Sequence, residues 1–379
     1  MSPNWGKADM TRTSPNPDIN TAQSATRRLR VRLSRMEMSM PELDSSHIMQ
    51  VGMGFFASKA LLSAVELGLF TELAKQPMTA LEIARSLGLH PRGVPDFPDA
   101  LVALKFLERT GDGPDGLYSN TPESAEFLDR NSPNYIGGIL EMANARLYRF
   151  WSDLTEALKT GAPQNETKHS GEPMFAKLYE APERLEQFMK AMSGVSAGNF
   201  KAFAQNFDFS KYKTLCDVGG ATGQLSCMVA AAHPHMRCTS FDLPKVLPIA
   251  ARKIKEAGLT DRVTAVSGDF FADPLPNADV ITMGMILHDW NLEKKKALIR
   301  KAYDALPQGG AFVVIEALID DARRENAFGL LMSLNMLIEF GDAFDYSGSD
   351  FASWCREVGF RDFETIPLTG PSSAAIAHK

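Results

Sequence analysis

The stretch "LCDVGGATGQLS", residues 215–226, places three glycines in a short segment directly after an aspartate. Apolar residues precede the glycines and a helix-compatible run follows them, so the segment predicts a β-strand, a tight turn and an α-helix. This order is typical of a nucleotide-type cofactor site. The turn at residues 219–223 departs from the GxGxxG pattern of dinucleotide-binding proteins, so its ligand has to be argued from other residues.

The composition is that of a globular chain, 379 residues long with 44% hydrophobic and 23% charged residues. A chain of this length is expected to form two domains. The net charge of −6 argues against nucleic acid as a partner, because polyanion binding depends on clustered Lys and Arg. No stretch approaches the roughly 18 uncharged apolar residues that a membrane span needs, so no membrane partner is expected either. The four cysteines lack CxxC spacing, which favours a reducing, cytoplasmic setting.

Residues 1–45 contain few large apolar side chains and many Pro, Asn, Ser and Thr, so we expect a largely disordered tail. Five arginines lie between Arg27 and Arg35. A basic targeting segment or a nucleic-acid arm would have this composition, but a solvated tail is the simpler interpretation.

Helical periodicity dominates residues 46–170. The spacing predicts a helix over Val51–Leu73 that is interrupted at Gly68, and Thr79 with Glu82 forms a capping box that begins a second helix. The run "DALVALKFLER", residues 99–109, predicts a third helix, and "GDGPDGLYSNT", residues 111–121, predicts a hairpin. Three helices followed by a hairpin are the order of a winged helix.

Winged helices commonly bind DNA, and a DNA-binding regulator that senses a small ligand is one hypothesis. The recognition segment would be Pro91–Arg109, whose three basic residues are balanced by three acidic ones (Arg92, Lys105 and Arg109 against Asp96, Asp99 and Glu108). Specific DNA binders are basic where they contact phosphate. The segment therefore favours a module for dimerisation and for covering a substrate.

Two further helical patterns, Tyr135–Thr160 and residues 174–207, precede a change of period. From Tyr212 onward, short apolar strands alternate with helical stretches, which predicts a Rossmann-like, mostly parallel sheet with helices on both faces. The expected parallel strands are "KTLCDV", "RCTSFD", "RVTAVSGD", "ADVITMGMIL" and "GAFVVIEALI", and "FRDFETIPL" and "SAAIAHK" are expected to add edge strands.

Acidic residues recur at the ends of the first three expected strands. Asp217 lies two residues before Gly219, where it would oppose a pyrophosphate but suits a ligand with a sulfonium and an ammonium group, such as S-adenosylmethionine. Asp242 is placed to accept the two ribose hydroxyls, and Asp269 with Phe270 to hold the adenine. Each aspartate is also a good helix cap, which is the alternative interpretation of any one of them.

The fourth strand is followed by "MILHDWN", which contains His288. Histidine is the commonest general base, because its pKa of about 6.5 keeps a neutral fraction at pH 7. Glu316 lies inside the fifth strand, where an ionised carboxylate needs a partner, and a carboxylate bound to an imidazole Nδ1 fixes its tautomer. Moving a proton from a phenol to such a base costs roughly 5 kcal/mol, against roughly 13 from an aliphatic hydroxyl, so a phenol or enol is the expected acceptor.

The motifs "LCDVGGATG", "FDLPKV", "GDFF", "LHDW" and "ALPQGGAFVVIEALI" together resemble those of the class I S-adenosylmethionine-dependent O-methyltransferases of the plant caffeate and hydroxyindole type, with their bacterial relatives. The resemblance extends from about Val51 to the C-terminus. It implies a helical N-terminal dimerisation domain, a homodimer, S-adenosylmethionine as methyl donor and His288 as the base. The implied donor-binding residues are Asp217, Gly219, Gly220, Gly223, Asp242, Leu243, Asp269, Phe270 and Trp290.

The family places two acids beside the base. Glu316 matches the first, and Asp345, in "DAFDYS", stands where the family has a Glu, one methylene longer. Gly284 is a second departure, because many members have a Lys four residues before the base. Met336 lies where the family has a Met against an aromatic acceptor, and Met142 falls in the helical segment that supplies further pocket residues. Asp289 is a further candidate substrate contact, and a Met at helical spacing is also typical of a core position.

The sequence thus predicts three parts: a tail (1–45), a dimerisation domain (46–170) and a catalytic domain (171–379). The predicted activity is methyl transfer to a hydroxyl of an aromatic or enolic small molecule. C- or N-methylation, or non-methylating use of the cofactor site, are the alternatives. No metal is expected, because His233 and His235 follow the first helix of the sheet domain, away from the acids.

Overall fold

The computed structural model describes residues 43–168 and 182–379. The described chain divides after Phe55, and residues from Phe56 to Lys379 form one compact unit. Helix α2 (Ser46–Gly52) precedes this division. Nearly all of the predicted tail lies outside the described residues, and the domain limit expected at residue 170 stays a prediction.

The predicted break at Gly68 and the predicted start of the second helix are both present, although the helix expected from Val51 begins at Gly54. Helix α3 (Gly54–Leu67) ends at Gly68, whose φ of +74° suits a residue without a Cβ, and α4 (Leu69–Leu73) follows. Helix α5 (Ala80–Leu87) begins with the predicted capping box. The Thr79 N–H donates to Glu82 Oε2 at 2.7 Å, and the Glu82 N–H donates to Thr79 Oγ1 at 3.3 Å.

The third predicted helix is shorter than expected. Helix α6 (Asp96–Ala103) ends early, Lys105 has a φ of +67°, and strand β2 (Leu107–Thr110) begins in the stretch predicted to be helical. Leu107 is buried in the core against which the helices pack, because β2 pairs with β3 (Leu117–Asn120) in the predicted hairpin. Strand β3 also pairs with β1 (Met78–Thr79), and α7 (Pro122–Leu128) follows the hairpin.

The long helix predicted over Tyr135–Thr160 is present but irregular. It consists of α8 (Gly137–Met142), a π-helical turn (Ala143–Leu147), α9 (Tyr148–Phe150), a 3₁₀ turn (Trp151–Asp153) and α10 (Leu154–Thr160). Gly161 ends it with a φ of +67°. The next described helix is α12 (Pro182–Asn206).

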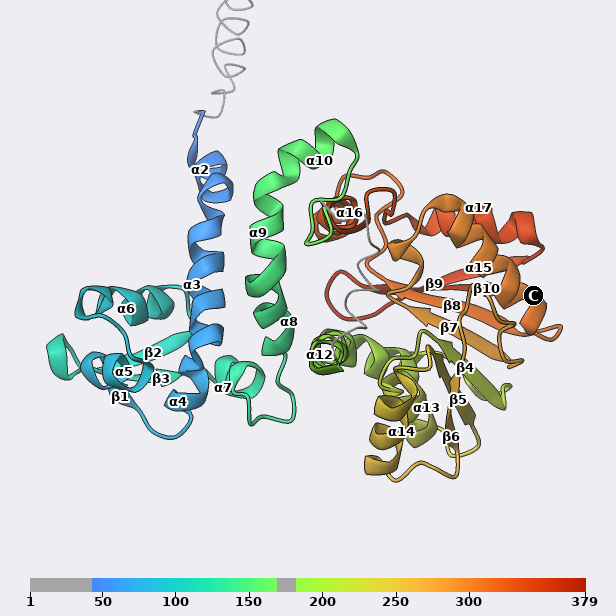
Figure 1. Cartoon of the computed structure of the whole chain (residues 1–379), viewed down its shortest axis with the longest axis horizontal. Helices are drawn as coiled ribbons and strands as arrows, with labels where there is room; N and C mark the ends of the chain where they lie inside the picture. The colour runs from blue at the N-terminus through green and yellow to red at the C-terminus, as the bar shows by residue number, and fades with distance from the viewer. Residues whose placement is uncertain (1–42, 169–181) are drawn as a thin grey trace, which may run out of the picture. The chain divides into compact units, whose positions relative to one another are not determined.

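The predicted sheet is confirmed, with seven strands in the order β6-β5-β4-β7-β8-β10-β9 (Figure 1). Five strands are parallel, and β10 and β9 are antiparallel at one edge. The bounds are β4 Thr214–Val218, β5 Arg237–Asp242, β6 Val263–Ser267, β7 Val280–Gly284, β8 Ala311–Glu316, β9 Asp362–Pro367 and β10 Ser373–His378.

Helices cover both faces of the sheet, and alternate strand residues face each layer. Val280 and Val313 pack with α12, α13 (Gln224–Ala232) and α14 (Leu247–Glu256). Ile281 and Val314 pack with α15 (Leu292–Ala305) and α17 (Gly348–Val358) on the other face. Helix α16 (Ala327–Phe340) lies between β8 and α17 in sequence. The carboxyl ends of the parallel strands therefore meet at one edge, where such sheets bind ligands.

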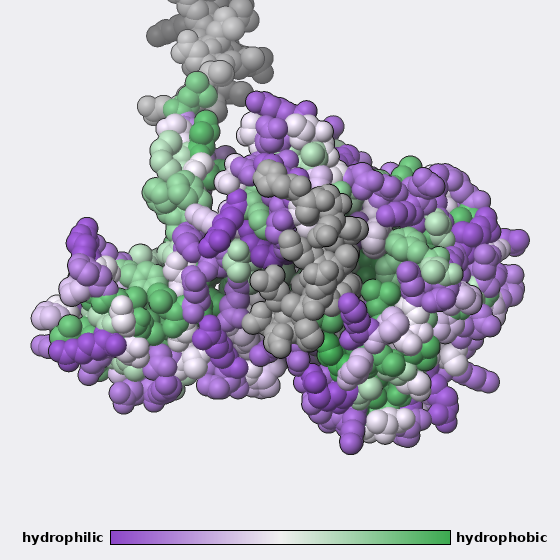
Figure 2. Space-filling view, in the orientation of Figure 1, coloured by the Kyte–Doolittle hydropathy of each residue, from purple (hydrophilic) through white to green (hydrophobic). Residues whose placement is uncertain are grey.

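The stretch Ser46–Leu67 exposes an unusual amount of apolar surface (Figure 2). By length and composition it could cross a membrane, with a mean hydropathy of 1.4, although it contains Lys59 and Glu66. The sequence predicts no membrane span, whereas this stretch is one candidate span among the described residues. Only 17% of the window is buried. The exposed large side chains between residues 46 and 56 are Ile48, Met49, Val51, Met53, Phe55 and Phe56.

Candidate active site

The glycine turn after β4 leaves no room for side chains. Gly219 has a φ of +70°, and a Cβ added there would overlap Ile286 Cδ1. A Cβ on Gly220 would overlap Ser240 Oγ and lie 3.1 Å from Asp217 Oδ2. The Gly219 N–H donates to the Phe241 carbonyl at 2.9 Å, which ties the turn to the end of β5. Neighbouring protein atoms therefore fill both Cβ positions, and only glycine fits at these two residues.

Asp217 lies beneath this turn, inside the sheet. Its Oδ1 accepts a hydrogen bond of 2.8 Å from Thr282 Oγ1 on β7, a partner that sequence reasoning missed. Burial, with a smaller contribution from Asp242, raises the pKa of Asp217 to about 7. The buried carboxyl packs against the turn, because the space at Gly220 is bounded by Asp217 Oδ2 and Ser240 Oγ.

Asp242, at the end of β5, is held by backbone amides. Its Oδ2 accepts from the Ala221 N–H at 2.8 Å and its Oδ1 from the Leu243 N–H at 2.7 Å. Burial raises its pKa, and these two amides oppose that effect. The carboxylate is thus fixed between the glycine turn and the next loop, and each oxygen keeps a further lone pair.

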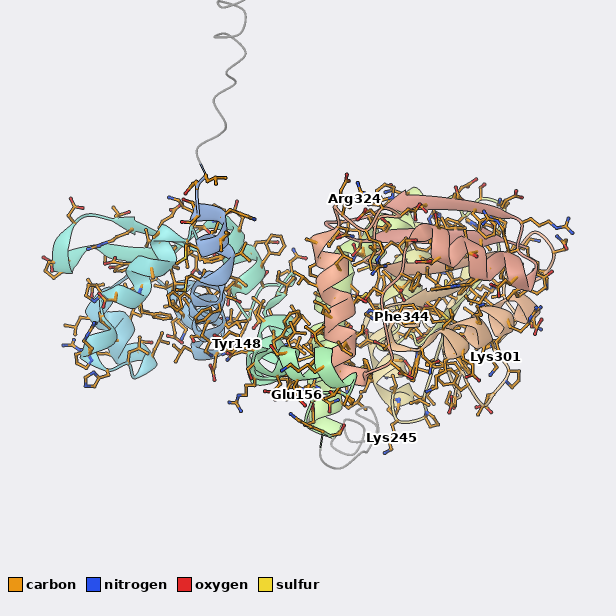
Figure 3. All side chains as sticks on the ribbon, turned by 90° about the horizontal axis from the view of Figure 1, so that it is seen from above. Tyr148, Glu156, Lys245, Lys301, Arg324 and Phe344 are labelled. Atoms are coloured by element: carbon orange, nitrogen blue, oxygen red, sulfur yellow. The ribbon has the colours of Figure 1, made fainter. Side chains whose placement is uncertain are left out.

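Asp269 and Phe270 follow β6, in a loop whose backbone is anchored twice. Asp269 Oδ1 accepts from the Phe271 N–H at 2.8 Å. Lys301, on α15 and labelled in Figure 3, donates to the carbonyls of Phe270, Phe271 and Asp273 at 2.7–2.8 Å. Sequence reasoning missed Lys301.

Three aromatic rings gather beside this loop. The Phe271 and Trp290 rings lie 4.7 Å apart and nearly perpendicular, and the Phe270 ring lies 4.8 Å from Phe271 and 6.1 Å from Trp290. Lys294 Nζ lies 4.7 Å from the Trp290 ring centre. The cluster joins the end of β6 to the turn after β7, and of its rings Phe271 was not expected.

The turn that carries His288 follows β7 directly. Met285 adopts a φ of +56°, which is uncommon for a residue with a side chain, and a 3₁₀ turn (Leu287–Asp289) comes next. Glu316 Oε1 accepts from the Ile286 N–H at 3.2 Å and the His288 N–H at 3.3 Å. Glu316 therefore anchors the backbone of the turn, where the sequence suggested a contact with the imidazole.

The imidazole of His288 lies between two aspartates. Its Nδ1 is 3.3 Å from Asp345 Oδ1, and its Nε2 is 3.4 Å from Asp289 Oδ1. The side chains of His288 and Asp345 are almost wholly buried. Asp345 thus lies within ion-pair distance of the ring despite being one methylene shorter than Glu, although neither its Oδ2 nor His288 Nδ1 meets the geometry of a hydrogen bond to any described residue.

Charge decides the protonation of this cluster. Burial lowers the pKa of His288, but Asp289, Asp345 and Glu316 together outweigh it and raise that pKa to about 10. Burial raises the pKa of Asp289 to about 7, and His288 opposes the shift. Burial also raises the pKa of Glu316. The three carboxylates therefore favour the protonated form of the imidazole in the free protein.

Gly284, the second departure from the family pattern, is explained by a neighbour. A Cβ on Gly284 would lie 3.0 Å from Phe200 Cε1 of α12. The ring occupies the space beside the end of β7.

Met336 is buried on α16, whereas Met142 ends α8 and is partly buried. Polar contacts join these two segments: Trp151 Nε1 donates to Asn335 Oδ1 at 2.9 Å, and Arg146 Nη2 donates to Glu339 Oε2 at 2.9 Å. Sequence reasoning missed these contacts, which no local pattern encodes.

His233 and His235 bind backbone carbonyls, of Ala204 at 2.7 Å and Phe209 at 3.1 Å. Within residues 43–168 and 182–379, no group of three or more His, Cys, Asp or Glu side chains is arranged to hold a metal ion.

Comparison with known proteins matches this architecture. An O-methyltransferase domain is recognised over residues 151–361 and an O-methyltransferase dimerisation domain over residues 49–130. The chain belongs to the O-methyltransferase family. The first segment covers the five parallel strands with their helices, and the second covers the helical N-terminal region, as the sequence predicts.

Relatives of this O-methyltransferase align along nearly their whole length. The tetracenomycin polyketide synthesis 8-O-methyl transferase TcmO of Streptomyces glaucescens is 42% identical over 88% of the chain and 96% of its own. The N,N-dimethyltransferase OxyT of Streptomyces rimosus is 37% identical over 85% and 92%. The crystal structure of human N-acetylserotonin methyltransferase in complex with SAM superposes with a TM-score of 0.82 at 29% identity, covering 90% of this chain and 99% of that one. The chain is an S-adenosylmethionine-dependent methyltransferase.

Proposed function

We propose that the enzyme transfers a methyl group to a hydroxyl of an aromatic or enolic small molecule, with His288 as the general base. The observation that carries this proposal is the buried imidazole between Asp345 and Asp289, at the carboxyl end of β7. The names of its relatives support an acceptor of the aromatic polyketide class, since TcmO acts in tetracenomycin polyketide synthesis.

The residues at the ends of β4, β5 and β6 fit S-adenosylmethionine. The glycine turn would present backbone without side chains to the donor, because a Cβ on Gly219 or Gly220 would overlap neighbouring atoms. Asp242 would accept the ribose hydroxyls through its remaining lone pairs, with Leu243 beside it. The loop of Asp269 and Phe270 would hold the adenine, with Trp290 against it. When bound, the donor supplies a methyl group on a positively charged sulfur.

The raised pKa of His288 suits a phenolic acceptor. A phenol has a pKa of about 10, so its proton would pass to neutral His288 at little cost, although the neutral imidazole is the minor form below a pKa of about 10. The same transfer to an unperturbed imidazole costs roughly 5 kcal/mol. Asp345 would hold Nδ1 and stabilise the charge, while Asp289 lies on the Nε2 side, where the acceptor hydroxyl would approach.

The acceptor would lie between α16 and the irregular helix of residues 137–160, which polar side chains connect to α16. Met336 and Met142 would contact the ring, as polarizable side chains commonly do. The exposed apolar residues between Met49 and Phe56, within the recognised dimerisation domain, support a homodimer formed through the N-terminal helices.

The test is a panel of fused-ring phenols, hydroxynaphthoates and enolic diketones incubated with donor carrying an isotopically labelled methyl group. The proposal expects a product with one added labelled methyl on oxygen, identified by mass spectrometry and NMR. The name of OxyT makes nitrogen the second position to examine. Label on nitrogen or carbon alone, or no label in any product, would contradict the proposal.

A further inference from the structure

Helix α15 carries a lysine on its buried face. The apolar face of this helix contains Leu298, Ile299, Ala302 and Ala305, and Lys295 occupies the first position of the same series. Its exposed fraction is 0%. A buried ammonium group lowers stability unless each of its N–H groups finds an acceptor, so Lys295 is expected to have dedicated hydrogen-bond partners.

All three donors of Lys295 are used. Nζ donates to the carbonyl of Leu287 at 2.8 Å, of Trp290 at 2.5 Å and of Phe344 at 2.8 Å. The Leu287 carbonyl belongs to the peptide group just before His288, and the Phe344 carbonyl to the one just before Asp345. One ammonium therefore joins the turn that carries the imidazole to the loop that carries its Nδ1 partner (Phe344 is labelled in Figure 3).

We propose that Lys295 is a positioning residue for methyl transfer, which holds Asp345 against His288 by binding the backbone on both sides of the pair. This inference rests on the proposed role of His288 as the base. The 3.3 Å distance between His288 Nδ1 and Asp345 Oδ1 depends on two separate segments, and Lys295 bonds to both. A displacement of about 1 Å at such a site can cost as much as 100-fold in rate.

The charges around the ammonium support this assignment. Burial lowers the pKa of Lys295 to about 8, and Glu316, Asp345, Asp289 and Asp342 oppose that shift. The Phe344 ring centre lies 4.1 Å from Nζ, and that of Tyr346 lies 5.4 Å away. The titratable groups around the His288–Asp345 pair come from β8, from the turn after β7, from the loop after α16 and from α15: Glu316, Asp289, Tyr346 and Lys295. Asp342 acts on Lys295.

The test is a double-mutant cycle read on the pKa of His288 by NMR of histidine-labelled protein, with the His288 signals assigned from His288→Gln. In the wild-type background, Asp345→Asn removes a carboxylate within about 4 Å and is expected to lower the pKa of His288 by about 1 unit or more. In the Lys295→Met background, Asp345 is no longer held in place, so the same substitution should lower that pKa by less than half as much.

The matched control is Lys296→Met. Lys296 is the next residue on α15, and it pairs at the surface with Glu357, where such pairs contribute little. In this background Asp345→Asn should shift the pKa of His288 as it does in the wild type. An equal shift in the Lys295→Met background would overturn the proposal. Should Lys295→Met fail to fold, Lys295→Gln, which removes the charge and keeps two donors, is read in the same cycle.

Turnover gives a second readout once an acceptor is identified. Lys295→Met is expected to lower kcat at least 10-fold while the Kd for S-adenosylhomocysteine stays within about 2-fold of wild type. Wild-type kcat in Lys295→Met would contradict the proposal. The NMR cycle needs no methyl transfer, so failure of the proposed acceptor chemistry leaves it informative, and failure of the cycle leaves the methyltransferase assignment untouched.

Discussion

The two halves of the sheet edge differ in how their acids are satisfied. In the half proposed to bind the donor, at the ends of β4, β5 and β6, Asp217, Asp242 and Asp269 are held by one hydroxyl and by backbone amides of neighbouring turns. In the half proposed to be catalytic, at the ends of β7 and β8, His288, Asp289, Glu316 and Asp345 face one another in a buried cluster.

The difference teaches how the two tasks are separated. Backbone amides fix the donor-half carboxylates in place before any ligand arrives, which reduces the entropy lost on binding. The catalytic half concentrates charge where water is excluded, which shifts pKa values and prepares proton transfer. Substitutions in one half should therefore change binding, and those in the other should change turnover.

The largest expected effect is that of His288→Gln. Removal of the base should lower kcat by about 100-fold or more, since general base catalysis contributes on this scale, while the Kd for S-adenosylhomocysteine stays near wild type. Steady-state kinetics and calorimetry measure the two quantities. His378→Gln, at a surface pair with Glu364, is the control and should leave both unchanged. Equal losses of donor affinity and of kcat in His288→Gln would contradict the separation of donor binding from proton transfer.

The pH dependence of kcat/KM gives the next largest effect. Because the pKa of His288 is raised to about 10, the neutral base is scarce at low pH and grows about tenfold with each pH unit below that value. We therefore expect kcat/KM for a phenolic acceptor to rise about 10-fold between pH 8 and pH 9, where Asp289, with a pKa of about 7, is already ionised. A plateau reached by pH 7 would mean that the carboxylates do not act on His288 as described.

Asp242→Asn tests the donor half. The amide would place N–H groups against the N–H of Ala221 or Leu243, so the side chain should lose its position. The Kd for S-adenosylmethionine is expected to rise about 10-fold, the equivalent of about 1.4 kcal/mol, with kcat at saturating donor little changed. Asp261→Asn, at an exposed position on the loop before β6, is the control. Unchanged affinity in Asp242→Asn would remove this residue from the donor site.

The smallest effect concerns the packing of β7. Gly284→Ala should lower stability by about 1 kcal/mol, because the new Cβ would lie 3.0 Å from Phe200 Cε1. Thermal unfolding should show a fall in Tm of roughly 2–4 °C. In the control Gly348→Ala, the nearest atom lies 3.8 Å away, so Tm should stay constant. A rise in Tm for Gly284→Ala would show that the space beside β7 is not filled as described.

Local patterns explain how much of this could be read from the sequence. The strands were predictable because buried parallel strands are continuous apolar runs, and Asp242, Asp269 and His288 follow them directly. The end of α6 at Ala103 could not be predicted, because the apolar spacing continues through Leu107 although that residue belongs to β2. Burial in the hairpin overrides the helical period there.

Contacts between distant segments were beyond local patterns. Asp345 faces His288 Nδ1 because the loop after α16 brings it there, and no local pattern predicts the path of that loop. The sequence therefore did not show that Glu316 binds the backbone of the turn and not the imidazole. Phe200 beside Gly284 belongs to α12, more than 80 residues earlier. Lys295 was within reach of sequence reasoning, because a lysine in an otherwise apolar helical series signals a buried charge with dedicated partners.

The separation of the two halves is tested most directly in a single turnover. Enzyme saturated with methyl-labelled donor is mixed with an accepted phenol, and label transfer is followed in wild type, His288→Gln and Asp242→Asn. The account predicts that Asp242→Asn, once saturated, transfers label at nearly the wild-type rate, whereas His288→Gln retains its donor and transfers at least about 100-fold more slowly. Wild-type transfer by His288→Gln would contradict it.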